Sequence, residues 1–168
     1  MGGRRCFGVL VAVSIGLGLP RAHGQDGLAT WIKALRDADP GKRAHAAAAL
    51  AELGPEARAA VPALAKLVAD GDNVVAYNAM ACLGHIGPGA EAAVPALITA
   101  LRHAQWERRA EAAAALGEIG PGARAAVPKL LDATLDEHPT VRDHAAAALV
   151  KIGAGAAAPV VEARARDA

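Results

Sequence analysis

Glycine recurs along this sequence at a constant spacing of 33 residues, and no other feature restricts the possible fold as strongly. Leucine, a second aliphatic residue and a Val-Pro pair keep the same step. The register comprises Gly54, Gly87, Gly120 and Gly153; Leu50, Leu83, Leu116 and Leu149; and Val61-Pro62, Val94-Pro95 and Val127-Pro128. A period of this length is typical of arrays of stacked, similar units. We therefore expect a chain built from copies of one unit.

Within one unit, the residues predict two helices joined by a short turn. Apolar and small residues recur at helical spacing from 44 to 53, and Gly54-Pro55 then ends the helix. Glycine adopts the left-handed backbone without penalty, and proline cannot continue the hydrogen-bond ladder. After a turn at 57–60, we expect a second helix from about 61 to 69, with Pro62 in its first turn. A polar loop at 70–73 closes the unit.

The same plan recurs along the chain. The sequence predicts a half repeat at 28–37 and four units that start near 41, 74, 107 and 140, the last of them shortened. Hydrophobic residues make up 54% of the 168 residues but aromatic residues only 2%, which favours a thin layer of closely packed helices over one thick core. Trp31 falls in the register of Leu64 and is expected to close the end of this core.

The first 24 residues have the order of segments found in a secretory signal peptide. Two arginines precede an apolar run from Cys6 to Leu19, and Ala22 and Gly24 are small residues placed for cleavage before Gln25. The run is shorter than the roughly 20 residues that a membrane span needs. We expect export to the periplasm or the extracellular space, with residues 25–168 as the mature repeat domain and no membrane span in it. The alternative is a signal retained as an anchor.

Charge and cysteine content limit what the mature chain can bind. Removal of residues 1–24 leaves 15 basic residues against 17 acidic ones, without a basic stripe for nucleic acid phosphates. Cys82 is then the one remaining cysteine, so an intramolecular disulfide is excluded. We predict no nucleic acid partner.

Two stretches carry a resemblance to a known family. The pattern of arginine, alanines, Ala-Leu-x-x-Ile-Gly and Ala-Val-Pro-x-Leu runs through 109–130 and, in part, 140–153. It resembles the HEAT-like repeats first grouped with phycobilisome lyases, over about 28–166. The Thr-Pro-Leu-His start of ankyrin repeats and the aromatic pattern of tetratricopeptide repeats are absent. The resemblance implies an all-α fold, a right-handed α-solenoid of helix pairs.

The same resemblance implies an ion-pair ladder, in which an arginine opening each first helix pairs with an aspartate of the preceding loop. Arginine stands there in three units and aspartate in two: Arg43, Arg109 and Arg142, and Asp39 and Asp72. Ala76 replaces the arginine of the second unit, and Gln105 and His138 replace aspartates. We expect these residues, with the four repeated glycines, to serve structure.

No arrangement of residues predicts catalysis, a metal site or a cofactor. The His-Glu pairs that hold iron in the deoxyhypusine hydroxylase branch of these repeats are absent, and His45 and His144 lie three units apart. Ser14, inside the expected signal, is the single serine. Cys82 shares its register with alanines, which predicts an inert core thiol.

We therefore predict a non-enzymatic module that binds or scaffolds an unknown protein or peptide. Aromatic side chains depart from the repeat at Tyr77 and Trp106, on adjacent units, where they serve either as binding anchors or as local packing. The second helices are expected to expose a mixed set of polar residues on the concave face: Lys66, Thr99, Lys129 and Asp132.

The alternative function is an enzyme, or an enzyme subunit, resembling the bilin lyases or the iron-dependent hydroxylases among HEAT-like proteins. A third possibility, a resemblance to HEAT-like DNA glycosylases, is opposed by the expected export and by the acidic balance of the mature chain.

Overall fold

The structure is a computed structural model, and it describes residues 25–153. Within these residues the chain is all-α, with the α-helices α1 Gln25–Ala34, α2 Pro40–Leu53, α3 Val61–Leu67, α4 Asn73–Ile86, α5 Val94–Ala100, α6 Trp106–Ile119, α7 Val127–Ala133 and α8 Pro139–Gly153. No helix of this part of the chain is long and apolar enough to cross a membrane. The expected signal peptide and the end of the shortened last unit lie outside the described residues.

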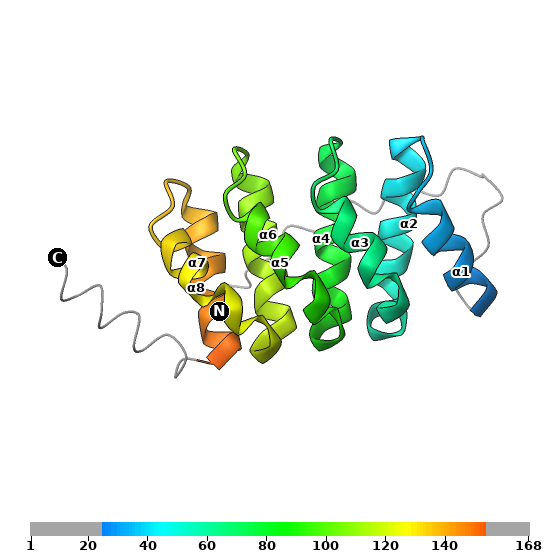
Figure 1. Ribbon diagram of the computed structural model, residues 1–168. Helices are drawn as coiled ribbons and strands as arrows, with labels where there is room; N and C mark the ends of the chain where they lie inside the picture. Colours follow the sequence, from blue (N-terminus) through cyan, green and yellow to red (C-terminus); the bar gives the residue numbers. More distant parts are fainter. Residues whose placement is uncertain (1–24, 154–168) are drawn as a thin grey trace, which may run out of the picture.

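The helices form a row of pairs that runs from α1 and α2 at the right of Figure 1 to α7 and α8 at the left. The first helices α2, α4, α6 and α8 pack side by side, and the second helices α3, α5 and α7 each pack on the first helix that follows. First helices begin at Pro40, Asn73, Trp106 and Pro139, one residue before the expected starts. The prediction of stacked 33-residue helix pairs is confirmed.

The turn inside each unit is more regular than the sequence indicated. Three 3-10 helices connect the paired α-helices, where the sequence predicted a short turn: η1 Gly54–Ala60, η2 Gly87–Ala93 and η3 Gly120–Ala126. Each begins with its glycine at positive φ, as expected, with values of 54°, 66° and 70°. The ψ angles of −128°, −135° and −138° do not belong to the left-handed helical region. They belong to the first central position of a type II′ turn, which favours glycine more strongly still.

The core is a thin aliphatic layer between the two rows of helices. Leu50, Leu83 and Leu116 are fully buried, whereas Leu149, in the last described helix, is partly buried. First helices approach closely through small residues: a Cβ on Gly117 would lie 2.9 Å from the Cα of Ala148. Trp31 is buried at the N-terminal end of the layer, as its register predicted.

Candidate functional site

The loops that lead from one unit to the next lie together along one side of the solenoid. These loops, 35–39, 68–72, 101–105 and 134–138, and the first turns of the helices that follow them form what we call the loop edge. The 3-10 helices lie at the opposite ends of the helices and form the Gly-Pro edge. In Figure 1 the loop edge is uppermost and the Gly-Pro edge lies below.

Two arginines, one partly buried and one buried, hold the loops of this edge through hydrogen bonds. The Arg43 guanidinium donates to both carboxylate oxygens of Asp70, at 3.0 and 2.9 Å, and to the carbonyls of Asp37 and Ala38. Sixty-six residues later Arg109 repeats the arrangement, with donor–acceptor distances of 2.7 and 2.8 Å to Asp136. Each arginine thus joins the loop before its helix to the loop after it.

The acidic partners are not the predicted ones. The sequence paired the arginines with Asp39 and Asp72, but the bound carboxylates belong to the following loop, at Asp70 and Asp136. Asp39 instead accepts a hydrogen bond from the Gly41 N–H, and Asp72 accepts from the N–H groups of Val74 and Val75. They cap α2 and α4, because a short carboxylate at this position satisfies N–H groups that the helix leaves unpaired.

Electrostatics follow this geometry. The hydrogen bonds from Arg109 hold the pKa of Asp136 below its ordinary value, against the opposing effect of burial. Burial alone would raise the pKa of Asp70, but hydrogen bonds from Arg43 and the Asp72 N–H lower it. Arg142, the third ladder arginine, is exposed and donates to the carbonyls of Asp136 and Glu137.

The second unit breaks the ladder, and another arginine takes part of its place. Ala76 carries no donor, so the carbonyl of Asp70 accepts from the Arg108 guanidinium instead, at 2.8 Å. Arg108 also donates to the Asn73 side chain and is only 5% exposed. We did not predict Arg108 from the sequence. The signal that could have found it is its register, which holds the apolar Val75 and Val141 in the neighbouring units.

The two predicted aromatic anchors have different partners. Trp106 stacks on the His138 ring, with centroids 3.7 Å apart and an angle of 10° between the planes. The partner of Trp106 therefore lies in the following loop, directly before α8. Tyr77 instead interacts with Glu111 of α6, and burial followed by the Glu111 charge raises the pKa of its hydroxyl. Both rings remain accessible, Tyr77 at 40% and Trp106 at 37%.

A hollow of about 270 Å³ opens between α4 and α6 on this edge. Its lining mixes polar, charged and apolar side chains: Asn73, Val74, Tyr77, Gln105, Glu107 and Arg108. Of the predicted binding residues it includes Tyr77 and leaves out Trp106. Val74 is 60% exposed, and with Tyr77 it gives the hollow an apolar wall.

The predicted polar residues of the second helices are accessible, and Lys129 and Thr99 each make a contact within their own helix. Lys66, Thr99 and Asp132 are exposed on successive units, as predicted, and Lys129 is half-buried. Lys129 and Asp132 form an ion pair within α7 at 3.0 Å. The Thr99 hydroxyl donates to the carbonyl of Pro95, inside its own helix. These contacts leave a mixed surface on which the structure defines no site.

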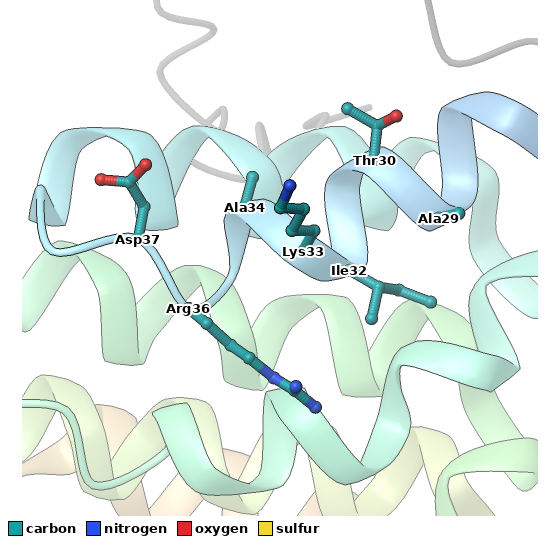
Figure 2. Close-up of a pocket in the computed structure, with 7 residues that line it drawn as sticks. All are labelled: Ala29, Thr30, Ile32, Lys33, Ala34, Arg36 and Asp37. Atoms are coloured by element: carbon teal, nitrogen blue, oxygen red, sulfur yellow. The ribbon is translucent and has the colours of Figure 1, made fainter.

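A larger hollow, of about 570 Å³, lies along the first helix. Figure 2 shows its lining: Ala29, Thr30, Ile32, Lys33, Ala34, Arg36 and Asp37. Thr30 and Lys33 point to one side of α1, and Ile32 and Arg36 point to the other. The polar groups therefore do not face a common point, and this surface is a weaker candidate than the loop edge.

The side chains that could serve chemistry have structural positions. Cys82 is fully buried, and burial raises the pKa of its thiol to about 12, which makes a nucleophilic thiolate inaccessible. His144 Nδ1 lies 3.0 Å from the carbonyl of Ala110, and His45 packs edge-on against Trp31. Within residues 25–153, no three side chains of metal-ligand type lie close enough to hold an ion.

Comparisons with known structures identify the same architecture. The complex of CpcE and CpcF of phycocyanin lyase from Nostoc sp. PCC7120 is 28% identical to this chain, over 89% of this chain and 62% of that one, with a TM-score of 0.65. An engineered protein is 27% identical over 82% of this chain and 41% of its own, with a TM-score of 0.64. A designed armadillo repeat protein in complex with the peptide (KR)4 shares the fold at 21% identity, over 76% of this chain and 65% of its own, with a TM-score of 0.67.

This chain spans less than two thirds of the length of each of these structures. No curated protein matches its sequence. A family model of HEAT repeats, however, matches residues 28–117 and again 94–168, which together cover most of the chain. The chain belongs to the HEAT repeat family.

Proposed function

We propose that this chain is a non-enzymatic scaffold that binds a protein or peptide, and that the loop edge between α4 and α6 is its binding surface. One observation carries the proposal. The side chains that depart most from the repeat gather on this edge, around or beside one hollow, while the Gly-Pro edge varies little from unit to unit. Aromatic and arginine side chains are the residue types that dominate binding energy at protein interfaces.

The fold supports this proposal. A solenoid of helix pairs presents an extended surface, and its units tolerate different side chains because each contacts mainly its neighbours. The designed armadillo repeat protein of the same fold is in complex with a peptide, so an array of this architecture can bind one. We transfer from it the class of partner and no binding residue.

Export is part of the proposal. Its support is the order of segments in residues 1–24, which is that of a secretory signal peptide. Mass spectrometry of the exported protein should give an N-terminus at Gln25. A chain that retains residues 1–24 would replace export with membrane anchoring.

The phycocyanin lyase complex gives the enzyme alternative a specific basis, because it covers 89% of this chain. A subunit of a bilin lyase would bind a bilin pigment, and a chain resembling the iron-dependent hydroxylases would bind iron. Absorption spectra and metal analysis of the protein from its native host decide between the two functions. Stoichiometric bilin or iron would overturn the non-enzymatic proposal.

Site-specific photo-cross-linking tests the binding surface. A benzoylphenylalanine probe at Val74, 60% exposed on the loop edge, is compared with the same probe at Val150, which is 72% exposed on α8. In extracts of the native host, we expect a discrete protein adduct from position 74 and none from position 150. Equal labelling from the two positions, or none from either, would remove the loop edge as the binding surface.

The contribution of Trp106 is then measured with the captured partner. We expect Trp106→Ala to weaken binding more than single alanine substitutions of Lys66, Thr99 or Asp132, since an anchoring aromatic is typically worth about 2 kcal/mol on truncation. The stack on His138 gives the competing explanation that Trp106 serves stability. A lower melting temperature with unchanged affinity would assign Trp106 to packing.

A further inference from the structure

Arg108 is a buried cation that forms no ion pair of its own within the described part of the chain, although its charge contributes to the lowered pKa of the Asp70 carboxyl, which Arg43 binds. Arg43 and Arg109 each contact a carboxylate of the following loop, at 2.9 and 2.7 Å. Arg108 is more deeply buried than Arg109, yet it takes part in none of the ion pairs among residues 25–153. Its hydrogen-bond acceptors are the amide oxygen of Asn73 and the carbonyl oxygen of Asp70, both of them uncharged.

A buried charge normally has a partner of opposite sign, because neutral acceptors replace its lost hydration only in part. The Nε atom and one terminal nitrogen of Arg108 make the hydrogen bonds, while the other terminal nitrogen has no acceptor among the described residues. The field at this edge is positive enough to affect a neighbour: burial lowers the pKa of His103, and the charges of Arg108 and Arg109 lower it further. The vicinity of Arg108 is therefore suited to an anion.

The walls of the hollow define what kind of anion fits. Val74 and Tyr77 supply accessible apolar surface beside the guanidinium, and Gln105 supplies a polar rim. Glu107 also lines the hollow, but it is exposed and forms no ion pair with Arg108. At about 270 Å³ the hollow is smaller than the pockets that hold drug-sized ligands, and it suits one or two side chains of a peptide.

We propose that the hollow between α4 and α6 binds an acidic residue of a partner peptide, an Asp or Glu next to an apolar residue. The carboxylate accepts hydrogen bonds from Arg108, and the apolar neighbour packs on Val74 and Tyr77. The pairing gives Arg108 a carboxylate from the partner, whereas Arg43 and Arg109 find theirs inside the chain. This inference rests on the proposed function, since it names the chemistry of the partner at the same surface.

A phage-displayed library of random dodecapeptides, selected on the immobilised domain, tests the proposal. Enriched peptides should carry Asp or Glu beside an aliphatic or aromatic residue. A fluorescent copy of the most enriched peptide should lose at least about tenfold in affinity for Arg108→Gln, because a buried charge pair is broken. Replacing the acidic residue of the peptide by its amide should weaken binding to the same degree.

Two further variants keep the result interpretable if Arg108→Gln fails to fold. Val74→Glu places a negative charge on the exposed rim of the hollow, where it repels the carboxylate of the peptide, and should abolish binding. The substitution lies in the first turn of α4, where an acidic residue is compatible with the helix. Arg142→Gln removes an exposed arginine of the same edge and should leave affinity unchanged. Peptides without acidic residues, or affinity insensitive to Val74→Glu, would overturn the inference and leave the proposed function standing. A selection that enriches no peptide also overturns it, whereas the proposed function is tested separately, by the cross-linking at positions 74 and 150 and by the pigment and metal analysis.

Discussion

The two edges of this solenoid differ in how much the units resemble one another. At the Gly-Pro edge, three 3-10 helices of seven residues repeat with nearly the same glycine conformation. At the loop edge the junctions are not all alike: Arg43 and Arg109 bind Asp70 and Asp136 in the same way, but Ala76, in the unit between them, has no such side chain, and Arg108 reaches back to Asn73. The Gly-Pro edge is thus the constant part of the repeat, which every unit needs, and the loop edge is the part in which side chains can differ between units.

The physical reason lies in what each edge must do. The Gly-Pro edge reverses the chain through a backbone conformation that glycine alone adopts easily, so each unit needs the same residue there. The loop edge is held by side chains, and several combinations of arginine, aspartate and asparagine fasten a loop equally well. Side chains at the loop edge can therefore differ between units with little loss of stability, and we place the binding surface there.

The largest effect should come from the core that joins the two edges. Leu116→Asp puts a charge at a fully buried position of α6, and we expect a loss of about 4 kcal/mol or more, with unfolding of the array. The matched control is Glu118→Ala, since Glu118 is exposed and pairs with Lys151 at the surface. Similar thermal midpoints by circular dichroism for the two variants would show that the leucine register is not the core.

The next effect tests whether the loop edge depends on its buried pairs. Asp136→Asn leaves Arg109 without its main carboxylate, and we expect a loss of about 3 kcal/mol near neutral pH. Since Arg109 holds the pKa of Asp136 below its ordinary value of 3.8, the contribution is complete above that pH. It disappears as the pH falls through the lowered pKa of the folded state.

Denaturant unfolding at pH 6 and in acid measures this dependence. Asp143→Asn, on an exposed position of α8, is the control and should change stability little at either pH. If the two variants were equally stable at pH 6, the ion pairs of the loop edge would make no contribution to the stability of the fold. The contrast between the edges would then lie in the backbone alone.

Much of this architecture follows from the sequence because it depends on residues that repeat. Gly54, Gly87 and Gly120 predicted the helix ends, and Leu116 and its equivalents predicted the core. The register did not indicate the ψ angle of the glycines, because the left-handed and type II′ regions both favour glycine. Asp39 and Asp72 were assigned to the wrong interaction, since a carboxylate before a helix suits a cap as well as an ion pair.

The candidate site was less accessible to sequence reasoning because its contacts join different units. Tyr77 was identified as a departure from the repeat, but its contact with Glu111 and the separate stack of Trp106 on His138 depend on side-chain directions. Arg108 escaped notice because an adjacent arginine, Arg109, already filled the expected ladder position. A comparison of each register for charged residues among apolar ones would have found it.

A smaller effect compares glycines of the two edges directly. A Cβ at Gly120 meets no atom within 4 Å, but its φ of 70° is unfavourable for alanine, so Gly120→Ala should cost about 1 to 3 kcal/mol. Gly71, on the loop edge, is equally open and does not have positive φ. Gly71→Ala should therefore be neutral or stabilising by less than about 1 kcal/mol. A lower melting temperature for Gly71→Ala than for Gly120→Ala would contradict the conclusion that the Gly-Pro edge requires its glycines.

The smallest effect is expected for substitution of Glu111, which should raise the stability of the fold, whereas the larger effects above lower it. Burial raises the pKa of the half-buried Glu111 carboxyl above its ordinary value of 4.5, while the hydrogen bond from Tyr77 and the charge of His144 oppose the rise. A raised pKa in the folded state means that ionisation destabilises the fold as the pH rises above 4.5. Glu111→Gln keeps an oxygen for the Tyr77 hydroxyl and removes the charge, so we expect a small increase in melting temperature at pH 7 that vanishes in acid below pH 4.5.

The exposed Glu107→Gln, on the same helix, is the control and should not change the melting temperature at either pH. A stabilising Glu111→Gln substitution would mean that the Tyr77–Glu111 contact reduces the stability of the array at neutral pH. Residues that reduce stability are typical of functional sites, where binding competes with packing. Unchanged melting at pH 7 would instead place Glu111 and Tyr77 among the interchangeable residues of the loop edge, and the binding surface would then depend on Arg108 and Val74 alone.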